Sequence, residues 1–105
     1  VHGVLPGTVA DVHAGEVEER ILHYPGVAEC AVIGLPDDMW GESVTAVVVA
    51  MDSVSLNADA VIAMCREHLA GFKTPKQILL QTEPLPRTAT GKVQKFLLVE
   101  RYAKR

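Results

Sequence analysis

Two long apolar runs constrain the fold of this chain more than any other feature. The segments VAECAVIGL (27–35) and ESVTAVVVAM (42–51) are rich in valine and alanine, and turn residues bound each of them. Valine favours strands, and nearly continuous apolar runs are typical of a sheet that is covered on at least one face. We therefore expect two buried strands, joined by the loop PDDMWG (36–41).

Segments with helical spacing alternate with these strands. In LNADAVIAMCREHLAG (56–71) Asn57 is a suitable N-cap and Gly71 a C-terminal stop, and one face carries the apolar stripe Val61, Ile62, Cys65 and Leu69. The other expected elements are a helix in GEVEERILHYPG (15–26), a third strand in QILLQ (77–81) and a last helix in KVQKFLLVERYAKR (92–105). This order predicts an α+β domain, with about three helices packed on a small, mostly three-stranded sheet.

Length and composition limit the class of protein. A chain of 105 residues forms one domain, and its 49% hydrophobic and 22% charged residues are ordinary for a globular protein. No apolar run approaches the roughly 20 residues that span a bilayer, and the first residues do not resemble a signal peptide. Cys30 and Cys65 lie in apolar stretches, so we expect two buried free thiols and a cytoplasmic protein.

Charge is distributed unevenly along the chain. Residues 1–65 hold one basic and ten acidic side chains, a net −9, whereas residues 66–105 hold nine basic and three acidic ones, a net +6. The basic part suits an anionic ligand such as a phosphate, and internal attraction between the two parts explains the pattern equally well. With 5% aromatic residues, a pI near 5.7 and no recognised motif, nucleic acid is not an expected partner.

The stretch PLPRTATGKVQKF (84–96) is the strongest candidate for chemistry. Its prolines stiffen the backbone, its threonines offer hydroxyl groups, and Gly91 permits a turn directly before Lys92. If Lys92 begins the last helix, its ammonium group and the helix N-terminus together form an anion site; an exposed lysine with no partner is the alternative. The stretch is not a P-loop, because its first glycine is missing and valine follows the lysine.

The same stretch closely resembles the C-terminal signature of the AMP-forming acyl-CoA synthetases, the superfamily that includes luciferases and peptide-synthetase adenylation domains. EVEERILHYPGVAECAVIGLPDDMWGESVTAVVV (16–49) and REHLAGFKTPKQI (66–78) resemble two further segments of that family, in the family's order. Three ordered motifs cover most of the chain. We therefore identify residues 16–105 as resembling the family's C-terminal domain. Within the family, the sequence of the first segment is most similar to acyl- and aryl-CoA ligases.

The resemblance implies a mechanism and a set of site residues. Members use ATP with magnesium to convert a carboxylate to an acyl-adenylate, and then transfer the acyl group to CoA. Lys92 would be the catalytic lysine that the small domain, acting as a lid, delivers to the reacting anions. Binding roles would fall to the loop residues Arg87, Thr90 and Gly91, and to Arg66 and Lys73 near CoA phosphates or the large domain.

Other residues receive weaker interpretations. Lys95 would support Lys92 from a similar helix face, and Gly41 and Glu42 match a family Gly-Glu pair that we expect to be structural, with Trp40 as a packing anchor. The four histidines, His2, His13, His23 and His68, form no convincing metal-ligand arrangement.

The first 15 residues depart from the family. They replace its hinge residue and hairpin, so neither feature can be assigned to a position here. The ATP-binding domain is also missing from the sequence, so we expect the chain alone to be inactive and to need a large adenylation domain as its partner. The alternative is a stand-alone interaction module that kept the fold. A bare interface also favours a homodimer.

Overall fold

The computed structural model describes residues 13–37 and 41–103, and the expected replacement of the hinge by residues 1–15 falls almost wholly outside them. Within these residues the chain forms three α-helices, one short 3-10 helix and three strands. In chain order they are α2 (Ala14–Leu22), β1 (Val27–Asp37), β2 (Gly41–Ala50), α3 (Ala58–His68), η1 (Gly71–Lys73), β3 (Gln77–Gln81) and α4 (Lys95–Ala103). The predicted α+β order of elements is confirmed.

The sheet has the strand order β1-β2-β3. Strand β2 pairs antiparallel with β1, for example Val32 with Ala46, and parallel with β3, for example Ala46 with Ile78. The parallel pair requires a crossover, which α3 provides. Strand β2 is therefore central, and its residues 43–49 are all buried.

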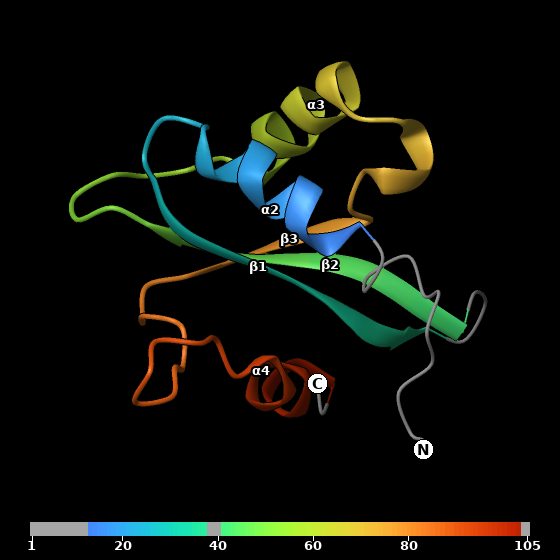
Figure 1. Cartoon of the computed structure of the whole chain (residues 1–105). Helices are drawn as coiled ribbons and strands as arrows, with labels where there is room; N and C mark the ends of the chain where they lie inside the picture. Colours follow the sequence, from blue (N-terminus) through green and yellow to red (C-terminus); the bar gives the residue numbers. More distant parts are fainter. Residues whose placement is uncertain (1–12, 38–40, 104–105) are drawn as a thin grey trace.

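Helices cover both faces of this sheet (Figure 1). Helices α2 and α3 pack on one face, and α4 packs on the other. The core beneath α2 and α3 contains Val17, Ile21, Val61 and Cys65 from the helices, together with every second residue of the strands. The core beneath α4 contains Leu98 and Leu85, together with the strand residues that point to the other face. Because both faces are buried, the alternation of polar and apolar residues disappears, which explains the near-continuous valine runs.

The boundaries of several elements differ from the prediction. Strand β1 continues to Asp37 and β2 begins at Gly41, so the expected loop 36–41 is shorter than its composition suggested. Asn57 caps α3 as predicted, and its side-chain oxygen accepts from the amide of Ala60 at 3.1 Å. Gly71 is not the stop of α3, because the helix ends at His68 and the next residue is already extended. Gly71 instead begins η1.

Cys30 and Cys65 are free and buried in the same core, as expected. Burial raises the pKa of Cys30 to about 12, and it also raises the pKa of Cys65. Among the described residues, no helix is long and apolar enough to cross a membrane.

Candidate functional site

The segment that carries Lys92 folds into a short hairpin between β3 and α4. Arg87 and Val93 form an antiparallel bridge, and the amide of Gln94 donates to the carbonyl of Pro86 at 2.8 Å. At the tip, the amide of Thr88 donates to the carbonyl of Lys92 at 2.8 Å, and the amide of Gly91 donates to the carbonyl of Thr88 at 2.9 Å. The loop is therefore an ordered hairpin.

Gly91 has the conformation that this turn requires. Its φ of 92° lies in the left-handed region that favours glycine, and a three-residue hairpin loop needs a residue with positive φ at this point. The hydroxyl groups of Thr88 and Thr90 lie 3.0 Å apart, and the Thr88 hydroxyl oxygen accepts from the amide of Lys92 at 3.2 Å. Gly91 and both threonines thus shape the turn that precedes Lys92.

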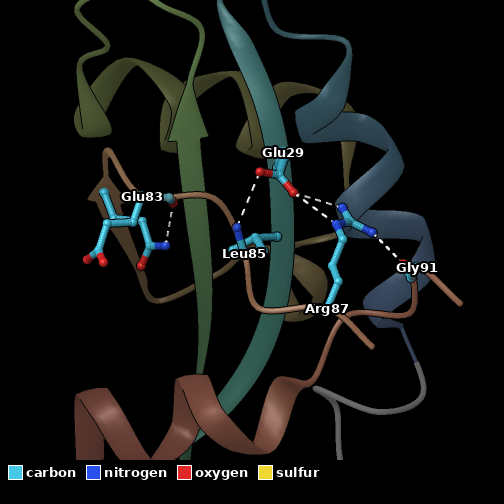
Figure 2. A network of polar contacts seen from close by, with 6 residues as sticks. Glu29, Glu83, Leu85, Arg87 and Gly91 are labelled. Carbon is cyan, nitrogen blue, oxygen red and sulfur yellow. Dashed lines mark hydrogen bonds and ion pairs between the residues drawn. The ribbon is translucent and has the colours of Figure 1, made fainter. Parts of the chain in front are cut away.

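Glu29 of β1 anchors the hairpin to the sheet (Figure 2). Its Oε1 accepts from Nη2 of Arg87 at 2.8 Å and from Nε at 3.2 Å, while Oε2 accepts from the amide of Leu85 at 3.3 Å. The third guanidinium nitrogen of Arg87, Nη1, donates to the carbonyl of Gly91 at 2.7 Å. Arg87 therefore bridges the strand and the residue directly before Lys92.

Lys92 is exposed at the end of this arrangement. In the part of the chain that the structure describes, its ammonium group makes no hydrogen bond or ion pair. It does not begin a helix, because α4 starts at Lys95. The expected anion site at a helix N-terminus is thus not formed around Lys92, and its position comes from the hairpin instead.

Lys95 does not support Lys92 from a shared helix face, because Lys92 lies before the helix. Its ammonium group forms an ion pair with Oε2 of Glu18 at 2.8 Å. The same oxygen accepts from the amide of Val32 in β1 at 2.7 Å. Lys95 is therefore part of the contact between α4, β1 and α2.

Lys73 and Arg66 lie away from the hairpin: Lys73 is in η1, and Arg66 is in α3, which precedes it. The Lys73 ammonium group pairs with Glu16 of α2 at 2.9 Å and lies 5.7 Å from the ring centroid of Phe72. The hydrogen bond from Lys73 holds the pKa of Glu16 below its usual value. Arg66 is exposed on α3. Since α2 and α3 cover the face opposite α4 (Figure 1), the structure does not gather these two cations with Lys92.

Three ion pairs join the basic part of the chain to its acidic part: Lys73 with Glu16, Arg87 with Glu29, and Lys95 with Glu18. Internal attraction therefore accounts for part of the charge asymmetry. Lys92 of the hairpin and Arg66 of α3 are exposed and form no ion pair with a described residue. Across residues 13–37 and 41–103, no cluster of three His, Cys, Asp or Glu side chains could hold a metal ion. His2 lies outside these ranges.

The Gly-Glu pair at the start of β2 has a packing role on its neighbouring strand. The Glu42 side chain lies across Gly34 of β1, where an added Cβ would come within 2.3 Å of the carboxylate. Because the carboxylate is the far end of a flexible, exposed side chain, a larger residue at position 34 would displace it without moving the backbone. Trp40 lies outside the described residues.

Sequence reasoning missed Glu29 and Glu18, the two carboxylates that hold Arg87 and Lys95. The signal for Glu29 was its place as the one acidic residue inside the apolar run 27–35. A charge in a half-buried strand needs a partner, and nine basic residues follow later in the chain. Which of them supplies the partner depends on tertiary structure.

Comparison with known proteins decides the family. The model of the AMP-binding enzyme C-terminal domain matches residues 16–92, which is most of the chain and includes Lys92. The chain belongs to this family.

Relatives that this chain matches include CoA ligases and a CoA synthase. The chain is 45% identical over 85 residues to feruloyl-CoA synthase of Amycolatopsis, and 42% identical over 93 residues to a long-chain-fatty-acid–CoA ligase of Mycobacterium tuberculosis. These alignments cover 81% and 89% of this chain, but 17% and 18% of the relatives. The chain thus spans less than a fifth of their length.

Solved structures share the fold of the AMP-binding enzyme C-terminal domain. Apo MatB from Rhodopseudomonas palustris superposes with a TM-score of 0.82 at 42% identity, over 89% of this chain and 18% of that one. The fatty acyl-CoA synthetase of Mycobacterium tuberculosis superposes with a TM-score of 0.77 at 42% identity, over 87% of this chain and 18% of that one. These likenesses confirm the predicted fold.

Proposed function

We propose that the chain acts as the C-terminal lid of an ATP-dependent acid–CoA ligase, with Lys92 as its catalytic residue. The observation that carries the proposal is a contrast among the cations of the hairpin and of the first residue of α4. Arg87 is neutralised by Glu29 and Lys95 by Glu18, whereas the Lys92 ammonium group is exposed and has no partner in the described part of the chain. The hairpin thus presents a single free cation.

This cation suits the adenylation half-reaction. A carboxylate and the α-phosphate of ATP repel each other as they approach, and a fixed ammonium group between them stabilises the charge that develops in the transition state. ATP with magnesium, CoA and the acid would be held mainly by a large adenylation domain. Without that partner the chain is expected to be inactive.

The test is a chimera in which this chain replaces the matching region of feruloyl-CoA synthase from Amycolatopsis, 45% identical over 85 residues. Adenylation is followed as ferulate-dependent exchange of pyrophosphate into ATP, and thioester formation as CoA transfer from preformed feruloyl-adenylate. Lys92→Ala should slow adenylation by about 10²–10³-fold and leave CoA transfer nearly unchanged. Equal loss of both steps, or loss of neither, would overturn the role of Lys92.

The control variant is Arg101→Gln, which removes a cation of α4 that is already paired with Glu83 at 3.4 Å. It should leave both half-reactions unchanged. Lys92→Arg should keep part of the adenylation rate, because it retains the charge but not the length and point-like geometry of the ammonium group.

Arg66 and Lys73 are proposed to contact CoA phosphates or the large domain. Exposure of Arg66 supports this role, and the exposed Lys73–Glu16 pair can exchange its carboxylate for a phosphate at little cost. Calorimetric titration of the chain with CoA should show binding that weakens in Arg66→Ala and in Lys73→Ala. If the unmodified chain shows no binding heat with CoA, the CoA role of these two residues is wrong, and contact with the large domain is favoured.

A homodimer of the isolated chain is proposed for a separate reason. Strand β3 lies at an edge of the sheet, and large apolar side chains including Leu80, Phe72 and Phe96 are exposed. Sedimentation should show an association that depends on concentration, and a clean monomer at high concentration would contradict it. The two buried free thiols support placement in the cytoplasm.

A further inference from the structure

We propose that Glu29 is a positioning residue for Lys92: through Arg87 it fixes the hairpin so that the lysine reaches the reaction centre. The inference rests on the proposed function of Lys92. Under this proposal Glu29 of β1, which is far from the loop in sequence, controls the rate of the adenylation half-reaction.

The first support is the face of the sheet on which Glu29 lies. The register of β1 against β2 shifts between Val27 and Glu29. Val27 and Cys30 both belong to the core beneath α2 and α3, although strict alternation would place residues three apart on opposite faces. From Glu29 onward the pairing is regular, and Glu29 alternates with Ala31 and Ile33, which belong to the core beneath α4. Glu29 therefore lies on the face of α4, where its carboxylate meets the Leu85 amide.

The second support is the arrangement of bonds around Glu29. Its two carboxylate oxygens take separate parts of the loop, the Leu85 amide and the Arg87 guanidinium group, and Arg87 passes the connection on to the Gly91 carbonyl (Figure 2). This chain of charge-assisted bonds ends at the peptide group that joins Gly91 to Lys92. No atom of Glu29 needs to touch substrate.

The third support is the exposure of the rest of the hairpin. Residues 87–92 are all exposed, so core packing holds the two ends of the hairpin, at the buried Leu85 and the half-buried Val93, but not its tip. The internal bonds of the hairpin fix its shape, but they do not fix its direction relative to the sheet. The Glu29–Arg87 pair supplies that direction.

The pair is suited to positioning more than to stability. The side chains of Arg87 and Glu29 are 45% and 20% exposed, and solvent screens such pairs. Its loss should leave the fold intact while the hairpin tip becomes mobile. Displacement of a catalytic group by about 1 Å is enough to slow a reaction by about 100-fold.

The experiment compares Glu29→Gln and Arg87→Lys with Lys92→Ala in the feruloyl-CoA synthase chimera. Both positioning variants should slow adenylation about 10-fold or more, with CoA transfer from preformed feruloyl-adenylate unchanged within about twofold. The double variant Glu29→Gln/Arg87→Lys should be no slower than the slower single one, because the two residues act as one unit. Glu83→Gln is the matched control: it breaks another glutamate–arginine pair at 3.4 Å and should change neither rate.

A second readout uses the 105-residue chain itself. In NMR spectra the Arg87 Nε–H signal should be protected from exchange and lose this protection in Glu29→Gln, with increased mobility of the Gly91 and Lys92 amides and none in β2. If a variant fails to fold, circular dichroism reveals it, and the other variant decides the question.

The outcomes separate the two proposals. If Lys92→Ala abolishes adenylation while Glu29→Gln and Arg87→Lys do not affect it, the positioning role is overturned and the function stands. If Lys92→Ala has no effect, the proposed function fails. Equal loss of both half-reactions in the Glu29 variant would show a general structural role and overturn positioning.

Discussion

The ammonium group of Lys95 lies 2.8 Å from the carboxylate of Glu18, and this pair joins helices on opposite faces of the sheet. Glu18 belongs to α2 and Lys95 to α4, and the same Glu18 oxygen accepts from the amide of Val32 in β1. Strand β1 is an edge strand with unpaired amides on its outer side. The pair thus closes part of that edge and links the two helical layers across it.

Removal of the two partners should have unequal effects. Lys95→Met should lower the free energy of unfolding by about 1 kcal/mol, since the pair is partly exposed. Glu18→Ala should cost about 1–3 kcal/mol, because it also leaves the Val32 amide without an acceptor. Urea denaturation measures both values, and Glu19→Ala, on the exposed side of α2, is the control. Equal effects would show that the Val32 hydrogen bond contributes nothing.

Gly91 should resist substitution because of its backbone conformation. Gly91→Ala should destabilise the chain by about 1 kcal/mol, since φ of 92° is costly for alanine although no atom blocks the added methyl group. Gly15→Ala is the matched control: its site is equally open, but it lies in α2. That change should be neutral or stabilising by up to about 0.5 kcal/mol. Thermal unfolding of both variants checks the contrast.

The cap of α3 should contribute measurably to stability. Asn57→Ala removes the acceptor of the Ala60 amide and should cost about 1 kcal/mol, whereas Asn57→Asp should retain stability or increase it slightly through the helix dipole. Denaturant midpoints of the two variants provide the measurement. An Ala variant as stable as the unmodified chain would mean that solvent satisfies this amide equally well.

Burial of Cys30 predicts a loss of stability at alkaline pH. The folded thiol keeps its proton up to about pH 12, whereas the unfolded thiol releases it near its ordinary pKa of 9.0. The folded state therefore binds more protons between these values, and stability should fall by about 1.4 kcal/mol per pH unit above pH 9. Denaturation at pH 8 to 11 measures the slope, which should be shallower in Cys30→Ala. An unchanged slope would contradict the assignment.

Several elements could be predicted because local chemistry specifies them. The valine runs, the Asn57 cap and the helical spacing of 58–68 determine strands and helix through propensity, capping and periodicity, which act over a few residues. The prediction that Gly71 ends α3 was wrong because a glycine after a helix can either end that helix or begin the next turn. Which of the two occurs depends on where η1 packs. The start of the last helix was misplaced for the same reason: α4 begins at Lys95, three residues after Lys92.

The sequence alone determined the α+β class, the family resemblance and the choice of Lys92 as the candidate residue, because these depend on patterns that are contiguous in the chain. Only the tertiary structure decided which cations are neutralised. Glu29 and Arg87 are 58 residues apart, and they meet because the segment that follows β3 packs on the α4 side of β1. Such pairings depend on strand register and helix packing, which no local pattern encodes, and among the described residues they leave Lys92 as the hairpin cation without a partner.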